Sequence, residues 1–181
     1  NINEITSRLA KVEDLTSLEN NKYKPNHPVN PDIISAIIPK NVKTLVSGYY
    51  KNCTKLRKII FESNQISTIP SSFCEGCTSL EIIEIPSSVT EIGQKAFFGC
   101  SLLKNFDFSN IHTLHLAAFQ GCAFESIDLS SISLIEPYIF KDNANLKNVV
   151  IGSKITAIPK GLFEKCVSLT EIEIPITIEF I

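Results

Sequence analysis

The chain has 181 residues and a formal net charge of −2, with 17 Lys and Arg against 19 Asp and Glu. This near-neutral balance argues against nucleic acid or an anionic membrane surface as the partner. Hydrophobic residues make up 44% of the sequence and charged residues 20%, which predicts one packed domain rather than a disordered chain. No apolar run approaches the length of a transmembrane helix.

The first segment, residues 1–20, differs from the rest of the chain. Its apolar residues recur at helical spacing, so we predict an amphipathic helix with Asn3 as its N-cap. Two roles remain open for this helix: it covers the open end of the array that follows, or it is part of a coiled coil through which the chain forms oligomers. The apolar positions are Ile2, Ile5, Leu9, Val12, Leu15 and Leu18.

Residues 21–32 contain three prolines and no apolar period, which predicts an extended lead-in. We therefore divide the chain into residues 1–32, the helix and its proline-containing lead-in, and residues 33–181, a repeat domain. The chain starts at Asn1, contains no methionine and stops part-way through a repeat. We expect it to be a piece of a longer protein, with any secretion signal or anchor outside it.

A column of cysteines sets the period of the repeat domain. Its members, which we call the Cys/Asn column, follow one another at spacings of 24, 23, 22, 21 and 23 residues. An aromatic residue stands three or four residues before each member. A fixed period of this length predicts a solenoid of about six repeats plus a partial one. The Cys/Asn column comprises Cys53, Cys77, Cys100, Cys122, Asn143 and Cys166, and the aromatic column comprises Tyr50, Phe73, Phe97, Phe119, Phe140 and Phe163.

Each unit also carries apolar residues in a strand pattern, apolar-x-x-apolar-x-apolar, followed by two more apolar positions three residues apart. A unit of about 23 residues cannot bury its own apolar face, but stacked units bury a continuous core. Successive strands would then pair as a parallel sheet with a spacing of about 4.8 Å. We expect a strand, a turn, a second short extended piece and a helical or 3₁₀ turn in each unit.

The unit at residues 80–100 reads L-x-x-I-x-I-P-x-x-V-x-x-I-x-x-x-A-F-x-x-C. This pattern resembles the BspA-like, or Treponema-type, leucine-rich repeat, and the resemblance covers residues 33–181. Pro70, Pro159 and Asn143 depart from the pattern without threatening the fold. The resemblance implies an α/β repeat solenoid, a right-handed coil with a concave parallel β-sheet. It also implies a secreted or cell-surface adhesive protein.

Five of the six cysteines fall in the Cys/Asn column, where we expect buried, reduced thiols that pack as small apolar residues. Disulfides between neighbouring members remain the alternative, since their separation permits them. Cys74 and Cys77 form a CxxC, but there is no second pair for zinc and no thioredoxin-like context for redox chemistry.

His112-x-x-His115 is the one closely spaced histidine pair, and we predict exposed loop side chains for it. No motif for catalysis, metal or cofactor binding accompanies it, so we expect no enzyme, no metal and no cofactor. Asn52-Cys53-Thr54 is a glycosylation sequon, but its middle residue is a predicted core thiol, and we favour an unmodified Asn52.

The predicted sheet face supplies the candidate binding residues. Side chains alternate along a strand, so residues between the inward positions face outward. One outward column places Glu84, Asp107 and Asp128 on three successive strands, about 5 Å apart. Like charges in such a row are unfavourable. We interpret these three residues as an acidic stripe for binding, with Ile60 and Ile82 as apolar neighbours.

The alternative is an ordinary solvated face on which Lys104 and Lys147 screen the acids. With the acidic stripe as the site, the function that we predict is non-enzymatic recognition of a protein or other macromolecule, in adhesion at the cell surface. The alternative is an intracellular scaffold or regulatory subunit that uses the same face. Neither function involves nucleic acid or membrane insertion by this segment.

Overall fold

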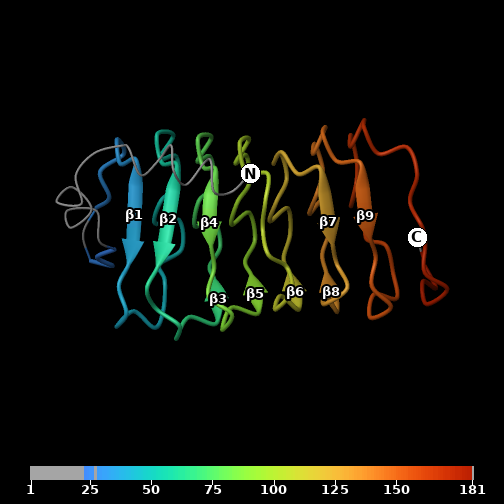
Figure 1. The fold of residues 1–181 in the computed structure, drawn as a ribbon, viewed down its shortest axis with the longest axis horizontal. Coiled ribbons are helices and arrows are strands. Elements are labelled where there is room, and N and C mark those ends of the chain that lie inside the picture. Colours follow the sequence, from blue (N-terminus) through green and yellow to red (C-terminus); the bar gives the residue numbers. More distant parts are fainter. Residues whose placement is uncertain (1–22, 27, 181) are drawn as a thin grey trace.

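The computed structural model describes residues 23–26 and 28–180, and it is a parallel β-solenoid (Figure 1). The predicted helix at residues 1–20 lies outside the described residues. Strands of successive repeats stand side by side along the long axis, in two rows. The strands are β1 (Ser35–Ile38), β2 (Lys58–Phe61), β3 (Thr68–Ile69), β4 (Ile82–Glu84), β5 (Glu91–Ile92), β6 (Thr113–Leu114), β7 (Ser126–Asp128), β8 (Leu134–Ile135) and β9 (Asn148–Val150).

All the strand pairs are parallel, and each joins one repeat to the next. One row contains the sheets β1-β2-β4 and β7-β9, and the other contains the sheet β3-β5-β6-β8. The register aligns equivalent repeat positions, as in the pairs Ile59 with Ile83 and Ile92 with Leu114. The predicted parallel solenoid is therefore confirmed.

The described residues contain no α-helix or 3₁₀-helix, so the helical or 3₁₀ turn expected in each repeat is not formed as a continuous helix. Hydrogen-bonded turns take its place, and their backbone N–H groups alternate between two kinds of acceptor. In the turn 93–100, Ala96 N and Phe98 N donate within the turn, to Gly93 O and Lys95 O. A helix would use all its N–H groups internally, whereas here every second one is free to reach the next coil.

The remaining N–H groups of these turns form a ladder between coils. In the same turn, Lys95 N, Phe97 N and Gly99 N donate to carbonyl oxygens of the next coil at 2.9, 2.8 and 2.8 Å. This arrangement needs left-handed backbone at two points, Lys95 (φ 54°) and Gly99 (φ 72°). Glycine adopts this conformation without the steric cost that a side chain brings. The turns thus form a third hydrogen-bonded ladder beside the two rows of strands.

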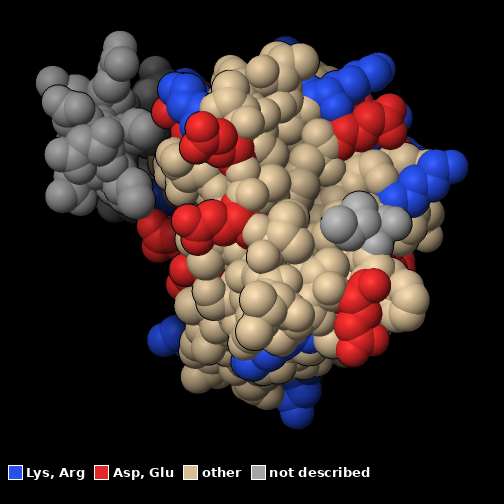
Figure 2. Space-filling view, turned by 90° about the vertical axis from the view of Figure 1, so that its right-hand side faces the viewer, with Lys and Arg blue, Asp and Glu red and all other residues tan. Residues whose placement is uncertain are grey.

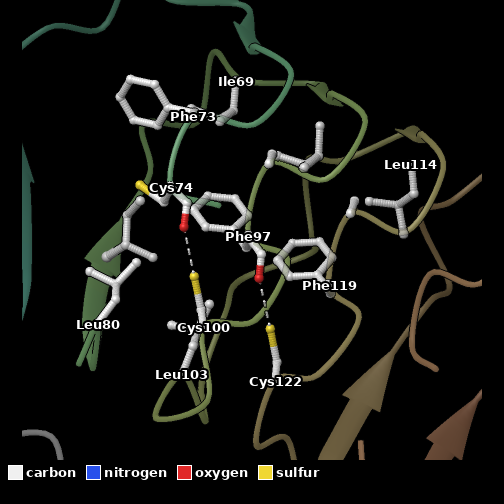
Figure 3. Packing of buried hydrophobic residues seen from close by; sticks show 14 of the residues in the cluster. Ile69, Phe73, Cys74, Leu80, Phe97, Cys100, Leu103, Leu114, Phe119 and Cys122 are labelled. Atoms are coloured by element: carbon white, nitrogen blue, oxygen red, sulfur yellow. Dashed lines mark hydrogen bonds between the residues drawn. The ribbon is translucent and has the colours of Figure 1, made fainter. Parts of the chain in front are cut away.

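The aromatic column forms the centre of the core (Figure 3). Tyr50, Phe73, Phe97, Phe119 and Phe140 are each at most 1% exposed. Phe97 and Phe119 stack nearly parallel, with ring centroids 5.2 Å apart. Each ring is therefore buried against the ring of at least one neighbouring coil, because one coil alone cannot enclose it.

The six side chains of the Cys/Asn column are buried, and the cysteines are free thiols. Each thiol from Cys77 onward donates to a carbonyl of the preceding coil: Cys100 Sγ lies 3.2 Å from Cys74 O, and Cys122 Sγ lies 3.3 Å from Phe97 O (Figure 3). Asn143 Nδ2 makes the equivalent bond to Phe119 O at 2.9 Å. The column is thus a line of side-chain donors that tie each coil to the previous one.

The two ends of the solenoid differ. Tyr23 covers the first coil: its N–H donates to Ile37 O, and its ring packs on Tyr49 with centroids 4.4 Å apart. Figure 2 views the opposite end, where a broad surface without charged side chains is bordered by acidic and basic ones. Ile176 and Phe180 are among the exposed apolar residues of the last coil. Within the part of the chain that the structure describes, no helix is long and apolar enough to cross a bilayer.

Replacing Phe97 with alanine should lower the free energy of unfolding by about 3–5 kcal/mol, because a cavity would open against the rings of Phe106 and Phe119, on which Phe97 packs. Denaturant unfolding measures the change. Phe180→Ala is the matched control, since Phe180 is 70% exposed, and it should alter stability by only about 0.5 kcal/mol. Equal losses in the two variants would contradict a core built on the aromatic column.

Asn143→Ala should cost about 1–3 kcal/mol, because it removes the buried donor to Phe119 O and leaves that link between coils unmade. Asn145→Ala, at an exposed position of the same turn, controls for local substitution and should be close to neutral. Chemical denaturation of both variants checks the prediction, and an Asn143→Ala protein as stable as Asn145→Ala would refute it.

Candidate binding face

The candidate site is the outer surface of the longer strands, which we call the strand face: the outward side chains of β1, β2, β4, β7 and β9 and of the segment 104–108 between β4 and β7. Parallel pairing places Ile60 of β2 beside Glu84 of β4, and Lys58 beside Ile82. Glu84 is exposed, whereas Ile60 and Ile82 are half-buried. The structure therefore brings Ile60, Ile82 and Glu84 together on one surface.

The acidic stripe does not lie on three adjacent strands. Asp128 is in β7, which belongs to a different sheet from β4, and Asp107 lies in the irregular segment 104–108. Within residues 28–180, no backbone hydrogen bond joins this segment to β4 or β7. The continuous sheet expected from the sequence is therefore wrong at this coil, and the strand face is divided into two sheets.

Two bulky rings occupy the coil where the pairing is lost. Phe106 and Phe108 occupy the inward positions that hold Ile83 and Ile85 in the coil of β4. Phe106 packs on Phe119 with ring centroids 4.8 Å apart, and Phe108 packs on the same ring at 5.3 Å. We attribute the lost pairing to Phe106, because Phe61 holds the same repeat position as Phe108 and is nevertheless paired in β2.

Asp107 and Asp128 use their carboxylates locally. Asp107 Oδ1 accepts a hydrogen bond from Ser109 N at 2.9 Å, and Asp128 Oδ1 accepts one from Ser130 N at the same distance. These Asx turns follow from the sequence pattern Asp-x-Ser, which we did not interpret in that way. The hydrogen bonds from Ser109 and Ser130 lower the pKa of Asp107 and Asp128, respectively. Both carboxylates therefore stay ionised at a lower pH than an ordinary aspartate does.

The neighbouring lysines do not neutralise the acidic stripe. Lys147 lies 3.8 Å from Glu125, and Arg57 forms a closer pair with Glu81 at 2.8 Å. Among the described residues, no Lys or Arg forms an ion pair with any of the three acids. The three acids are exposed, and they have no cationic partner within residues 28–180.

Apolar residues flank the acids on both sides. Pairing places Val150 of β9 beside Asp128 and Ile37 of β1 beside Ile60. Val150 is 52% exposed, and it was not among the site residues predicted from the sequence. Its position in the same repeat column as Ile60 and Glu84 was the available signal. The strand face therefore presents apolar, acidic and again apolar side chains in order along the solenoid.

His115 is the clearest residue that sequence reasoning missed. We predicted an exposed loop side chain, but the ring lies between two carboxylates: Nε2 is 2.8 Å from Glu91 Oε1, and Nδ1 is 3.0 Å from Glu136 Oε1. Its neighbour His112 is exposed. The available signal was that His115 and Glu136 hold the same repeat position in successive coils.

The CxxC motif and the glycosylation sequon do not form a reactive or metal-binding site. Cys74 and Cys77 are both buried, and burial raises the pKa of the Cys74 thiol. In the sequon, Asn52 and Thr54 are exposed, but burial raises the pKa of the Cys53 thiol between them to about 11. Within residues 23–26 and 28–180, no three His, Cys, Asp or Glu side chains are grouped so as to hold a metal ion.

Comparison with known families places the repeats in one of them. The family described as "BspA type Leucine rich repeat region (6 copies)" matches residues 29–130 and 67–181. These overlapping ranges include every strand of the solenoid. No curated protein matches the sequence.

Solved structures share the fold. The T. pallidum leucine-rich repeat protein aligns with a TM-score of 0.68 and 26% identity, over 75% of this chain and 67% of that one. A leucine-rich repeat protein from Eubacterium ventriosum gives 0.57 and 23%, over 80% of this chain and 40% of that one. A leucine-rich cell surface protein from Faecalibacterium prausnitzii gives 0.52 and 22%, over 81% and 49%. The chain thus spans less than half the length of these last two proteins.

The Asx turn at Asp128 leads to a testable prediction about the pKa of this residue. Ser130→Ala should raise the pKa of Asp128 toward the ordinary aspartate value, because the hydroxyl donor that favours the ionised carboxylate is lost. Carboxyl-detected NMR titration measures it, with Ser153→Ala, another exposed serine, as the control. An Asp128 pKa that is the same in both variants would contradict the role of the Ser130 hydroxyl.

Proposed function

Because the chain belongs to the BspA-type leucine-rich repeat family, we propose that it is a non-enzymatic recognition module that binds a protein or another macromolecule through the strand face. A leucine-rich repeat fold is typical of a protein-interaction module. Stacked coils hold their outward side chains in fixed positions along one surface, so the surface recognises a partner without rearranging.

The observation that carries the proposal is the acidic stripe between two apolar ends. Glu84, Asp107 and Asp128 are exposed and have no cationic partner among the described residues. Ile60 lies on one side of them and Val150 on the other. Unpaired charge flanked by apolar contacts gives specificity from the charge and affinity from the burial. Such a surface suits a partner with basic side chains beside an apolar one.

We propose adhesion at the cell surface as the setting. The support is the family, together with the name of the F. prausnitzii relative, which is a leucine-rich cell surface protein. The alternative is an intracellular scaffold that uses the same face. The observation that favours it is the set of six free cysteines, since reduced thiols persist in reducing compartments.

The test is capture of partners by the purified chain and by its variant Glu84→Lys, Asp107→Lys, Asp128→Lys. The baits face surface-labelled cells and, separately, a cytosolic extract. We expect a surface partner to bind the wild type and to be lost from the triple variant. Capture of a cytosolic partner only would favour the scaffold, and binding that survives the charge reversal would exclude the acidic stripe.

Two controls separate charge from damage to the turns. Glu62→Lys, Glu164→Lys, Glu179→Lys changes the net charge equally at exposed positions outside the strands of the strand face, and it should bind like the wild type. Asp107→Asn with Asp128→Asn keeps an acceptor for the Ser109 and Ser130 N–H groups while removing the charge. This double variant should keep the fold and weaken binding.

A further inference from the structure

Three titratable side chains from successive coils meet at the edge of the second row of strands. Glu91 is in β5, His115 follows β6 directly, and Glu136 follows β8 directly. The imidazole lies between the two carboxylates, at 2.8 Å from Glu91 and 3.0 Å from Glu136. The second oxygen of Glu136 accepts a hydrogen bond from Leu116 N at 2.7 Å. The arrangement therefore joins three coils through one ring.

The geometry requires both ring nitrogens to donate. An ionised carboxylate only accepts hydrogen bonds, and a neutral imidazole has one N–H and one lone pair. A neutral His115 would therefore turn a lone pair toward one of the two carboxylates. The imidazolium ion satisfies both contacts, with two charge-assisted hydrogen bonds.

We propose that Glu91, His115 and Glu136 form a pH-sensitive clasp that fastens three consecutive coils when the imidazole is protonated and loosens when it is neutral. The strands beneath the clasp pair through only two residues each. The side-chain hydrogen bonds of the clasp therefore add to a backbone pairing that is short in each of these coils. It lies on the second row of strands, apart from the strand face.

The charged groups that face the ring are Glu91, from β5, and Glu136, from the segment after β8. Burial acts to lower the pKa of His115, but the hydrogen bonds to Glu136 and Glu91 outweigh it and raise the pKa above the ordinary histidine value. The bond from His115 likewise lowers the pKa of Glu136. Both shifts favour the charged pair, as the geometry requires.

The two shifts define the pH window of the clasp. A raised histidine pKa adds stability that is complete below the unfolded value, about 6.5, and is lost as pH rises through the folded value. A lowered glutamate pKa adds stability that is present above its unfolded value, about 4.3, and is lost on further acidification. The clasp is therefore strongest in mildly acidic solution, at about pH 5–6.

The test uses the whole chain and its own internal control. The sequence has three histidines, so histidine-detected NMR titration resolves each ring, with His112→Gln and His115→Gln for assignment. We expect the midpoint of His115 to lie above that of exposed His112. In Glu91→Gln, Glu136→Gln the His115 midpoint should fall toward that of His112. A wild-type His115 midpoint at or below that of His112 would overturn the proposal. Both midpoints are measured in the wild-type protein, and the two histidine variants serve here only to assign the signals.

Thermal unfolding at about pH 5.5 and about pH 8 supplies the second measurement, since these values lie on either side of the histidine transition. The difference in Tm between wild type and His115→Gln should be larger at the acidic pH. His112→Gln, in which the other histidine of the same segment is replaced, should follow the wild type at both. The same pH dependence in His115→Gln and wild type would overturn a clasp that acts on stability.

Discussion

The structure depends on backbone hydrogen bonds that run from each coil to the next in the turns. Every second N–H group of a turn, such as Phe97 N, points along the solenoid and needs a carbonyl of the neighbouring coil, here Ala118 O at 2.8 Å. A buried N–H group without an acceptor is costly, so one coil cannot be stable alone. The same constraint explains the left-handed backbone at Lys95 and Gly99. The Cys/Asn column adds side-chain donors, thiol or amide, that bond to the preceding coil.

This ladder keeps the solenoid continuous where the strand face is broken. The segment 104–108 makes no backbone hydrogen bond to β4 or β7, yet the turn at 93–100 bonds to the next coil three times, and β5 pairs with β6. At the coil of Phe106 and Phe108, backbone pairing is lost only in the row of longer strands. The strand face therefore has a local interruption at Asp107, between Glu84 and Asp128, and the coils behind it remain in register. A partner on this face would meet two short sheets rather than one.

The sequence predicted the features that depend on apolar periodicity. The columns around Cys100 and Phe97 gave the repeat, the parallel stacking and the inward side chains, because burial repeats at a fixed spacing. Features that depend on individual contacts were missed. The lost pairing at Phe106 is one such feature. The Asp-x-Ser hydrogen bonds of Asp107 and Asp128 are another, and the contact of His115 with Glu91 is a third. The expected helical or 3₁₀ turn does not form as a continuous helix, because every second N–H group bonds to the next coil and apolar periodicity does not reveal this alternation.

Amide hydrogen exchange, resolved by residue, tests most directly whether the turns rather than the strands hold the coils together. Amides in the turn ladder, such as Phe97 and Gly99, should exchange only through opening of the coil stack and should be strongly protected. The amides of Phe106 and Asp107 should exchange rapidly, although they lie between two strands. Strong protection at Phe106 and Asp107 together with weak protection at Phe97 would contradict the account, because it would mean a continuous sheet and turns that do not bind the next coil.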